Sequence, residues 1–180
     1  MWYPTTIVDP ASTEPVSLDE VKRRLRVGFS DEDADIQLMI ASARDHAEKY
    51  CNITLAEQTV EMKCDCWADL ARMPVAPLMS VASIAYVDTE GAPQTVDAAV
   101  YELRLDGLEP SIVLAYGKRW PVVRTGSRIT VTAVAGYEDA PAAVKHAILL
   151  YIADAYETRE NSQEDDWSAF DALLSNYRRG

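Results

Sequence analysis

The longest apolar run of the chain, residues 141–157, predicts a buried helix around which the other elements pack. Pro141 suits a first helical position, because an N–H at that position has no partner within the helix. At helical spacing His146, Asp154 and Glu157 fall in one narrow arc, and apolar side chains cover most of the remaining circumference. Leu150 lies inside this polar arc, so we predict that it is exposed and available for a subunit contact.

Two shorter helical patterns precede this segment. Ser17 and Glu20 have the spacing of a capping box, which predicts a helix start, and Gly28 is a plausible stop for that helix. Ser30 is predicted to cap a second helix that runs to about Cys51. Because the link between them is short, we interpret the pair as an antiparallel helical hairpin.

Opposite charges follow one another in this hairpin. The first helix is basic, through Lys22, Arg23, Arg24 and Arg26, and it is followed by Asp31, Glu32, Asp33 and Asp35. A basic helix can contact nucleic acid or anionic lipid, but this sequence favours charge pairing within the chain or between subunits. Leu38 projects from the far side of the second helix, between polar residues, and is predicted to be exposed.

From about residue 55 to 136 the apolar spacing changes from helical to alternating. Val60, Met62, Cys64 and Cys66 alternate with polar residues, which is typical of a half-buried strand. Similar short runs occur around 81–87, 101–105, 112–116 and 129–133, and turn residues occupy 88–91. This spacing predicts an antiparallel sheet or a small sandwich. The first 13 residues are predicted to be irregular.

The last predicted helix carries an apolar stripe made of Trp167, Phe170, Leu174 and Tyr177, with Asp165 and Asp166 at its start. The predicted fold class is therefore α+β. A small bundle of about four helices, from residues 14–54 and 139–180, would carry an inserted antiparallel β-sheet or sandwich module at 55–136. We expect residues 1–180 to form a single domain.

The composition narrows the function classes. The hydrophobic share of 48% is ordinary for a globular protein, and the net charge is −12. DNA affinity depends mainly on neutralising phosphates, so an acidic chain is a poor DNA-binding protein, although DNA could slide past it. We find no pattern of a signal peptide and no stretch of membrane-spanning length, so we expect a product of the cytoplasm without a membrane partner.

Candidate chemistry is sparse. The three cysteines, Cys51, Cys64 and Cys66, do not suggest a disulfide framework, and a zinc site would need about four ligands. We interpret the thiols as buried and free, and His46 as a satisfied core side chain. No catalytic residue, metal site or cofactor is predicted, since no phosphate loop, nucleophile elbow or zinc-protease motif occurs. A carboxylate pair of the glycosidase kind stays open, because the separation of two carboxylates depends on the fold.

Four segments occur in the order PVSLDEVKRRLRV (15–27), DEDADIQLMIASARDHAEKYC (31–51), SIVLAYGKRWP (111–121) and ITVTAVAGYEDAPAAVKHAILLYIADAYETRE (129–160). Together they resemble the tailed-phage head–tail connector family, which is the head-completion adaptor also found in gene transfer agents. The resemblance implies a structural virion protein and no enzymatic activity. It implies a ring of about a dozen copies beneath the portal, which extends the DNA channel and docks the stopper or tail.

The implied partners are further copies of the chain, the portal protein and a stopper or tail-completion protein. DNA would pass through without specific binding. The implied location is the virion neck, at the head–tail junction, after synthesis in the host cytoplasm. In this family the C-terminal end reaches the portal, which on this chain implies contacts by Tyr177, Arg178 and Arg179.

A closed ring joins unlike patches of neighbouring copies, which suits the charge pattern. We hypothesise that Arg23, Arg24 and Arg26 face acidic residues of the next subunit, either Asp31, Asp33 and Asp35 or those within 157–166, with Leu38 and Leu150 as apolar contacts. We also expect the isolated protein to be monomeric until it meets the portal. The alternatives are another phage neck or tail-completion protein, an interaction module unrelated to phages and, ranked last, a carboxylate-dependent hydrolase.

Overall fold

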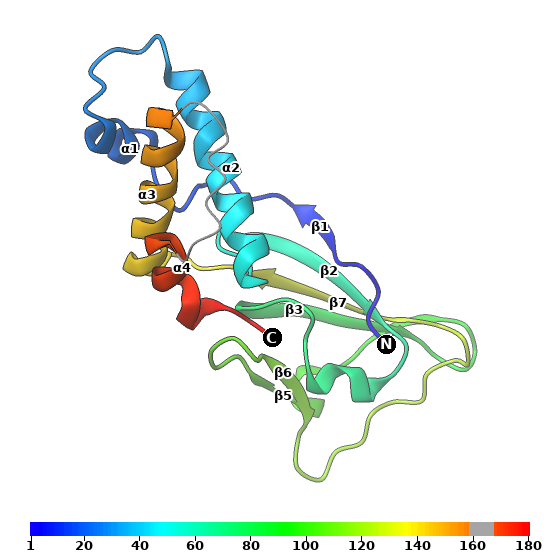
Figure 1. Ribbon diagram of the computed structural model, residues 1–180. Coiled ribbons are helices and arrows are strands. Elements are labelled where there is room, and N and C mark those ends of the chain that lie inside the picture. Colours follow the sequence, from blue (N-terminus) through cyan, green and yellow to red (C-terminus); the bar gives the residue numbers. More distant parts are fainter. Residues whose placement is uncertain (159–167) are drawn as a thin grey trace. The chain divides into compact units, whose positions relative to one another are not determined.

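The computed structural model describes residues 1–158 and 168–180 and divides the chain into two compact units (Figure 1). The sheet unit combines Met1–Ser12 with Glu57–Tyr137, and the helical unit combines Thr13–Ala56 with Glu138–Gly180. Each unit is described by itself below. Within the described residues the chain forms four α-helices and antiparallel sheets, which confirms the predicted α+β fold class.

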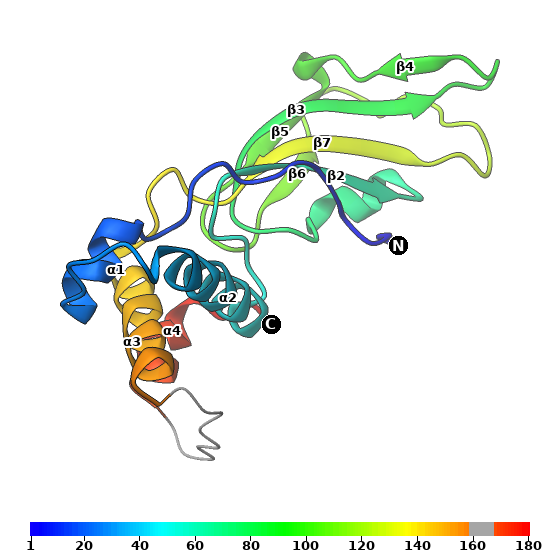
Figure 2. The ribbon, with the colours of Figure 1, turned by 90° about the horizontal axis from the view of Figure 1, so that it is seen from above.

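The sheet unit is built on five antiparallel strands in the order β1-β2-β7-β3-β4. Figure 2 shows β7 lying between β2 and β3. The strands are β1 (Thr6–Asp9), β2 (Gln58–Cys64), β3 (Leu78–Val87), β4 (Pro93–Thr95) and β7 (Ile129–Ala135). A separate two-stranded sheet contains β5 (Tyr101–Arg104) and β6 (Ser111–Leu114). Short 3₁₀ helices, η1 (Trp67–Ala71) and η2 (Ala98–Val100), occur within the loops.

Alternation along the central strands produces the core of the sheet unit. Every second residue of β7, from Ile129 to Ala135, is buried, and Met62 of β2 and Ile84 of β3 both pair with Val131. Because successive strand side chains point to opposite faces, this register collects the apolar side chains on one face. η1, the loop that follows it and β6 add Leu70, Met73 and Ile112 to the same cluster.

Two expectations for the sheet unit were wrong. The first 13 residues are not irregular, because β1 pairs with β2 (Ile7 opposite Val60) and Trp2 bridges to Cys64. The strand that contains Cys64 ends there, so Cys66 does not continue the alternation. Cys64 is buried and Cys66 is exposed at the start of η1. Neither difference can be read from local spacing, since both depend on pairing with distant residues.

The helical unit contains α1 (Leu18–Leu25), α2 (Asp33–Cys51), α3 (Ala142–Thr158) and α4 (Ala169–Leu174), followed by η3 (Ser175–Tyr177). The predicted core helix is confirmed as α3, and its buried side chains are Val144, Ala147, Ile148 and Ile152. α2 contributes the buried Ile36, Ile40, Ala43, Ala47 and Cys51. Within the described residues, none of the helices combines the length and the apolar character that crossing a membrane would need.

The helix ends test the capping predictions. The Ser17 side chain and Glu20 form a full capping box at α1, as predicted. The helix ends before Gly28, however, because Arg26 adopts the left-handed conformation with φ of 59°. Ser30 does not cap α2 with its side chain, since Glu32 occupies that N-cap without a side-chain hydrogen bond.

The last predicted helix is observed as α4, and Tyr177 of the predicted stripe follows it in η3. Ser168 and Asp171 form a capping box at the start of α4. Asp165, Asp166 and Trp167, which were predicted to begin this helix, lie outside the described residues.

Candidate assembly surfaces

The end of α1, the turn that follows it and the start of α2 carry the charged residues of the interface hypothesis. Lys22 Nζ lies 2.5 Å from Asp33 Oδ1, so this acidic group is already paired within its own chain. Arg23, Arg24 and Arg26 are exposed, as are Asp31 and Asp35, and within residues 1–158 and 168–180 none of these five forms an ion pair. The local pairing predicted for this segment is thus confirmed for Lys22. The pairing of Arg23, Arg24 and Arg26 with acidic residues of the next subunit stays a prediction. That prediction also named residues 159–166, which lie outside the described part of the chain.

The two leucines expected to be exposed differ in the structure. Leu38 has 70% of its surface exposed, as its place on the outer face of α2 predicts. Leu150 is only half-buried, although His146, Asp154 and Glu157 of the same arc are exposed. Phe29, in the turn before α2, is 52% exposed, and sequence reasoning missed it because no periodicity applies inside a turn. Exposed apolar side chains of this size often mark protein contacts when several lie close together.

The C-terminal segment packs against the bundle. Phe170 of α4 is 8% exposed and lies 5.6 Å from the ring of Tyr151, between ring centroids. The Arg178 guanidinium carbon lies 5.0 Å from the Tyr50 ring centroid, a cation–π distance. The backbone N–H of Arg179 donates to the carbonyl oxygen of Cys51 at 2.8 Å. Arg178 and Arg179, two of the three residues implied in a portal contact, are therefore held at the C-terminal end of α2.

Two of the residues weighed for chemistry differ in burial, since His46 lies on the surface and Cys64 in the core. His46 is exposed rather than buried, and its ring stacks on Tyr151 with centroids 4.9 Å apart. Burial raises the pKa of the Cys64 thiol to about 12, which disfavours the thiolate that metals and electrophiles need. Among residues 1–158 and 168–180, no three His, Cys, Asp or Glu side chains are grouped so that they could hold a metal ion.

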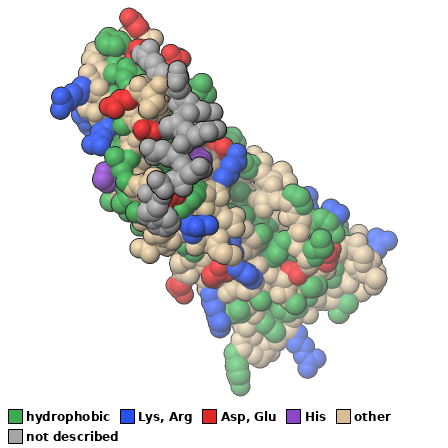
Figure 3. All heavy atoms as spheres, viewed as in Figure 1, with side chains coloured by type: hydrophobic (Ala, Val, Ile, Leu, Met, Phe, Trp, Pro, Cys, Tyr) green, Lys and Arg blue, Asp and Glu red, His purple; other side chains and the backbone are tan. Residues whose placement is uncertain are grey.

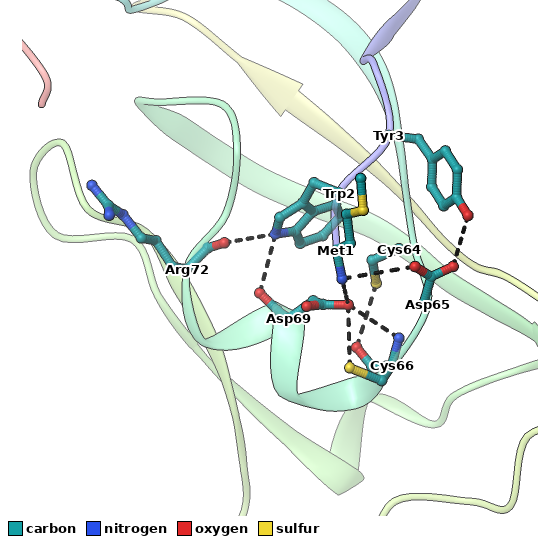
Figure 4. A network of polar contacts seen from close by, with 8 residues as sticks. All are labelled: Met1, Trp2, Tyr3, Cys64, Asp65, Cys66, Asp69 and Arg72. Atoms are coloured by element: carbon teal, nitrogen blue, oxygen red, sulfur yellow. Dashed lines mark hydrogen bonds and ion pairs between the residues drawn. The ribbon is translucent and has the colours of Figure 1, made fainter.

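A polar network attaches the first residues of the chain to η1 (Figure 4). The Met1 amino group donates to Asp69 Oδ2 at 2.6 Å, and Trp2 Nε1–H donates to the Arg72 carbonyl oxygen at 2.8 Å. Asp69 also accepts from the backbone N–H of Cys66 at 3.1 Å. The bond from the Met1 amino group is the main reason why the pKa of Asp69 lies below its ordinary value. This network stabilises the fold of the sheet unit.

Sequence comparison decides the family. Residues 15–103 match the family model of phage gp6-like head-tail connector proteins, from just before α1 to the third residue of β5. The chain belongs to the head–tail connector family. The resemblance inferred from the sequence is thereby confirmed. No curated protein sequence matches this connector protein.

Solved structures share the whole fold of this connector protein. A chain from the neck of an empty GTA particle, computed with C6 symmetry, superposes with a TM-score of 0.81 at 22% identity, covering 98% of this chain and 95% of that one. A chain from the virion of a native gene transfer agent (GTA) particle gives a TM-score of 0.81 at 24% identity, with the same coverage. A chain from the neck of a native GTA particle, computed with C12 symmetry, gives a TM-score of 0.68 at 22% identity, over 96% and 95%. At these identities the likeness establishes the fold.

Proposed function

We propose that this connector protein is a structural component of the neck of a phage or phage-like particle, where copies of the chain form a closed ring below the portal. The observation that carries the proposal is the match over 98% of the chain to a neck chain of a GTA particle, together with family membership. The similar neck structures were computed with six-fold and twelve-fold symmetry, which supports a ring of about a dozen copies here. Such a ring would extend the DNA channel and present a face to the stopper or tail.

The charges support a ring whose copies meet through unlike patches. Figure 3 shows basic side chains at the edge of the helical unit where Figure 1 places α1. Arg23, Arg24 and Arg26 account for the exposed basic residues of this segment, and Asp31 and Asp35 follow in sequence. In a heterologous contact, a basic patch of one copy meets an acidic patch of the next. DNA would pass without specific binding, since the chain carries a net charge of −12.

Electron microscopy of the full chain mixed with a portal protein tests the ring proposal. We expect a ring stacked on the portal, and we expect the isolated chain to sediment as a monomer. A complex in which single copies bind a tail protein, with no ring on the portal, would instead favour another neck or tail-completion role.

We also propose that Tyr177, Arg178 and Arg179 contact the portal. Arg178 and Arg179 lie at the end of the docked C-terminal segment, where their charges can meet an acidic portal surface. Arg178→Glu combined with Arg179→Glu should reduce co-sedimentation with the portal. The matched control is Arg104→Glu on exposed β5, which should leave co-sedimentation unchanged.

A further inference from the structure

The loop between β6 and β7, residues 115–128, is basic in an acidic protein. We call it the basic loop. Between Glu109 and Glu138 the chain has no acidic residue, whereas its net charge as a whole is −12. The positive side chains of the loop are Lys118, Arg119, Arg124 and Arg128. The loop reaches the lower edge of the view in Figure 1, and the charged side chains visible at that edge in Figure 3 are basic.

Aromatic packing holds the basic loop in one shape. Trp120 stacks on Trp67 of η1, with ring centroids 4.7 Å apart and planes 5° apart. The Trp67 indole N–H donates to the Pro121 carbonyl oxygen at 2.9 Å, and the backbone N–H of Arg124 donates to the Val87 carbonyl oxygen at 2.9 Å. A loop that is ordered before binding loses less conformational entropy when a partner docks.

The tip of the loop is a tight turn. The backbone N–H of Lys118 donates to the Ala115 carbonyl oxygen at 3.1 Å, and Gly117 has a φ of 73°. A type II turn requires a positive φ at its third residue, which glycine adopts without strain. The turn therefore presents Tyr116 and Lys118 to solvent, and both are exposed.

The basic loop exposes both apolar and cationic side chains. Tyr116 is fully exposed and Val122 is 72% exposed. Lys118 and Arg119 are exposed, and in the part of the chain that the structure describes neither forms an ion pair. Arg128 differs, because its guanidinium lies 3.8 Å from the Tyr3 ring centroid. Exposed aromatic and arginine side chains on a rigid support are typical of the residues that dominate protein interfaces.

The outer face of α2 offers a complementary surface. Asp35 and Leu38 are exposed along it, and Asp31 is exposed just before the helix, whereas Asp45 further along is paired with Lys49 Nζ at 2.6 Å. Leu38, 70% exposed, supplies an apolar group between the carboxylates. This face thus combines acidic and apolar groups, as the loop tip combines basic and apolar ones.

We propose that the basic loop of one copy docks on the outer face of α2 of the next copy. Lys118 and Arg119 pair with Asp31 and Asp35, and Tyr116 packs against Leu38. This contact is heterologous, so it can be repeated around a ring, and it rests on the ring proposed above. DNA is a less favourable partner for the loop. The net charge of −12 opposes DNA binding, and the apolar side chain of Val122 makes no favourable contact with phosphates.

Charge reversal tests the pairing in the full chain. Lys118→Glu with Arg119→Glu should weaken ring assembly on the portal by at least about tenfold at low salt. Adding Asp31→Lys and Asp35→Lys to the same chain should restore assembly, because the reversed charges again attract. Arg104→Glu, on an exposed strand of the same unit, should assemble as the unaltered protein does.

Disulfide trapping tests the contact independently of charge and of any loss of stability. In a Cys66→Ser background, Tyr116→Cys with Leu38→Cys should give a ladder of covalent oligomers when the assembled ring is oxidised, and either cysteine alone should give none. If rings still form after the charges of Lys118 and Arg119 are reversed, and if no ladder of disulfide-linked oligomers appears, the docking is wrong. The proposed ring is then unaffected. Absence of any ring on the portal from the unaltered chain would overturn both. Variants that assemble normally but lose retention of double-stranded DNA would assign the loop to DNA and overturn the docking.

Discussion

The backbone N–H of Arg179 donates to the carbonyl oxygen of Cys51 at 2.8 Å, which attaches the end of the chain to the end of α2. The last carbonyl groups of a helix lack partners within it, so this bond satisfies one of them. Asn52 ends α2 in the left-handed conformation, with φ of 55°. The C-terminal segment is therefore a structural part of the helical unit as well as the proposed portal contact.

Removing the buried anchor of this segment should destabilise the helical unit. Leu174 is fully buried, so Leu174→Ala should lower the free energy of unfolding by about 3 kcal/mol through lost burial and a residual cavity. Urea denaturation followed by circular dichroism measures the loss. The control Leu38→Ala, at a position 70% exposed, should change stability by less than about 0.5 kcal/mol. Equal losses of unfolding free energy in Leu174→Ala and Leu38→Ala would contradict the packing of α4 against the bundle.

The two serines predicted as helix caps should respond differently to alanine. Ser17 Oγ accepts from the Glu20 N–H at 3.3 Å, and the Ser17 N–H donates to Glu20 Oε2 at 2.8 Å. Ser17→Ala should therefore cost about 1 kcal/mol of stability. Ser30→Ala should cost less than about 0.5 kcal/mol, because its side chain does not cap α2. Thermal melts of both variants check this order, and a larger loss for Ser30 would refute it.

Only one thiol should react in the folded protein. Cys66 is exposed, whereas Cys51 and Cys64 are buried, and burial raises their pKa values to about 11 and about 12. Brief treatment with iodoacetamide at neutral pH should add one label, because the thiolate is the nucleophile and needs access. Mass spectrometry counts the labels, and Cys66→Ser should remove the one that is added. A label that persists in this variant would show that a buried thiol opens to solvent.

The hydrogen bonds between Ser168 and Asp171 at the start of α4 should contribute less stability in acid. The Ser168 hydroxyl donates to Asp171 Oδ2 at 2.5 Å and the Ser168 N–H at 2.9 Å, and these bonds hold the pKa of Asp171 below its ordinary 3.8. A carboxyl group whose pKa is lower in the folded state than in the unfolded state stabilises the fold at pH values above the unfolded-state pKa. That contribution is lost as the pH falls through the folded-state pKa.

This linkage sets the effect of removing the carboxylate. Asp171→Asn should cost about 1 kcal/mol near neutral pH and less at roughly pH 2. Thermal melts at both pH values measure the difference. Asp106→Asn, on an exposed loop, should show no such change with pH. A cost for Asp171→Asn that is the same at both pH values would exclude the carboxylate as its source.

Reversing the charge of α1 tests the competing assignment, in which Arg23 and Arg24 rather than the basic loop meet the acidic residues of the next copy. Arg23→Glu with Arg24→Glu should weaken ring formation on the portal, most strongly at low salt, because salt screens exposed charges. Negative-stain images of the mixture measure the fraction of portals that carry a ring. Arg104→Glu again serves as the matched control. Unchanged assembly of the double variant at low salt would remove α1 from the subunit contact.

Local pattern predicted the helices better than their ends. The apolar run at 141–157 predicted α3 to within one residue at each end, because helical periodicity is expressed within the segment itself. The capping box at Ser17 was recognisable because both partners lie within four positions. Gly28 and Ser30 failed as helix signals, since Arg26 and Glu32 already occupy the helix ends.

The candidate surfaces were predicted only in part. Leu38 was recognisable from helical projection, because it stands on a helix whose opposite face is clearly apolar. The basic loop was noticed only as a sequence motif, Tyr116 to Pro121, in the family resemblance. Its exposed tip depends on the stacking of Trp120 on Trp67, which joins residues more than fifty positions apart.

By itself the sequence determined the helical and alternating segments, the α+β class and the absence of any recognised catalytic motif, because these depend on residues a few positions apart. Tertiary structure decided the pairing of β1 with β2, the half-burial of Leu150 and the docking of Arg179 at the end of α2. Each of these depends on the free energy of contacts between segments that are distant in the sequence. A local sequence pattern does not contain that information.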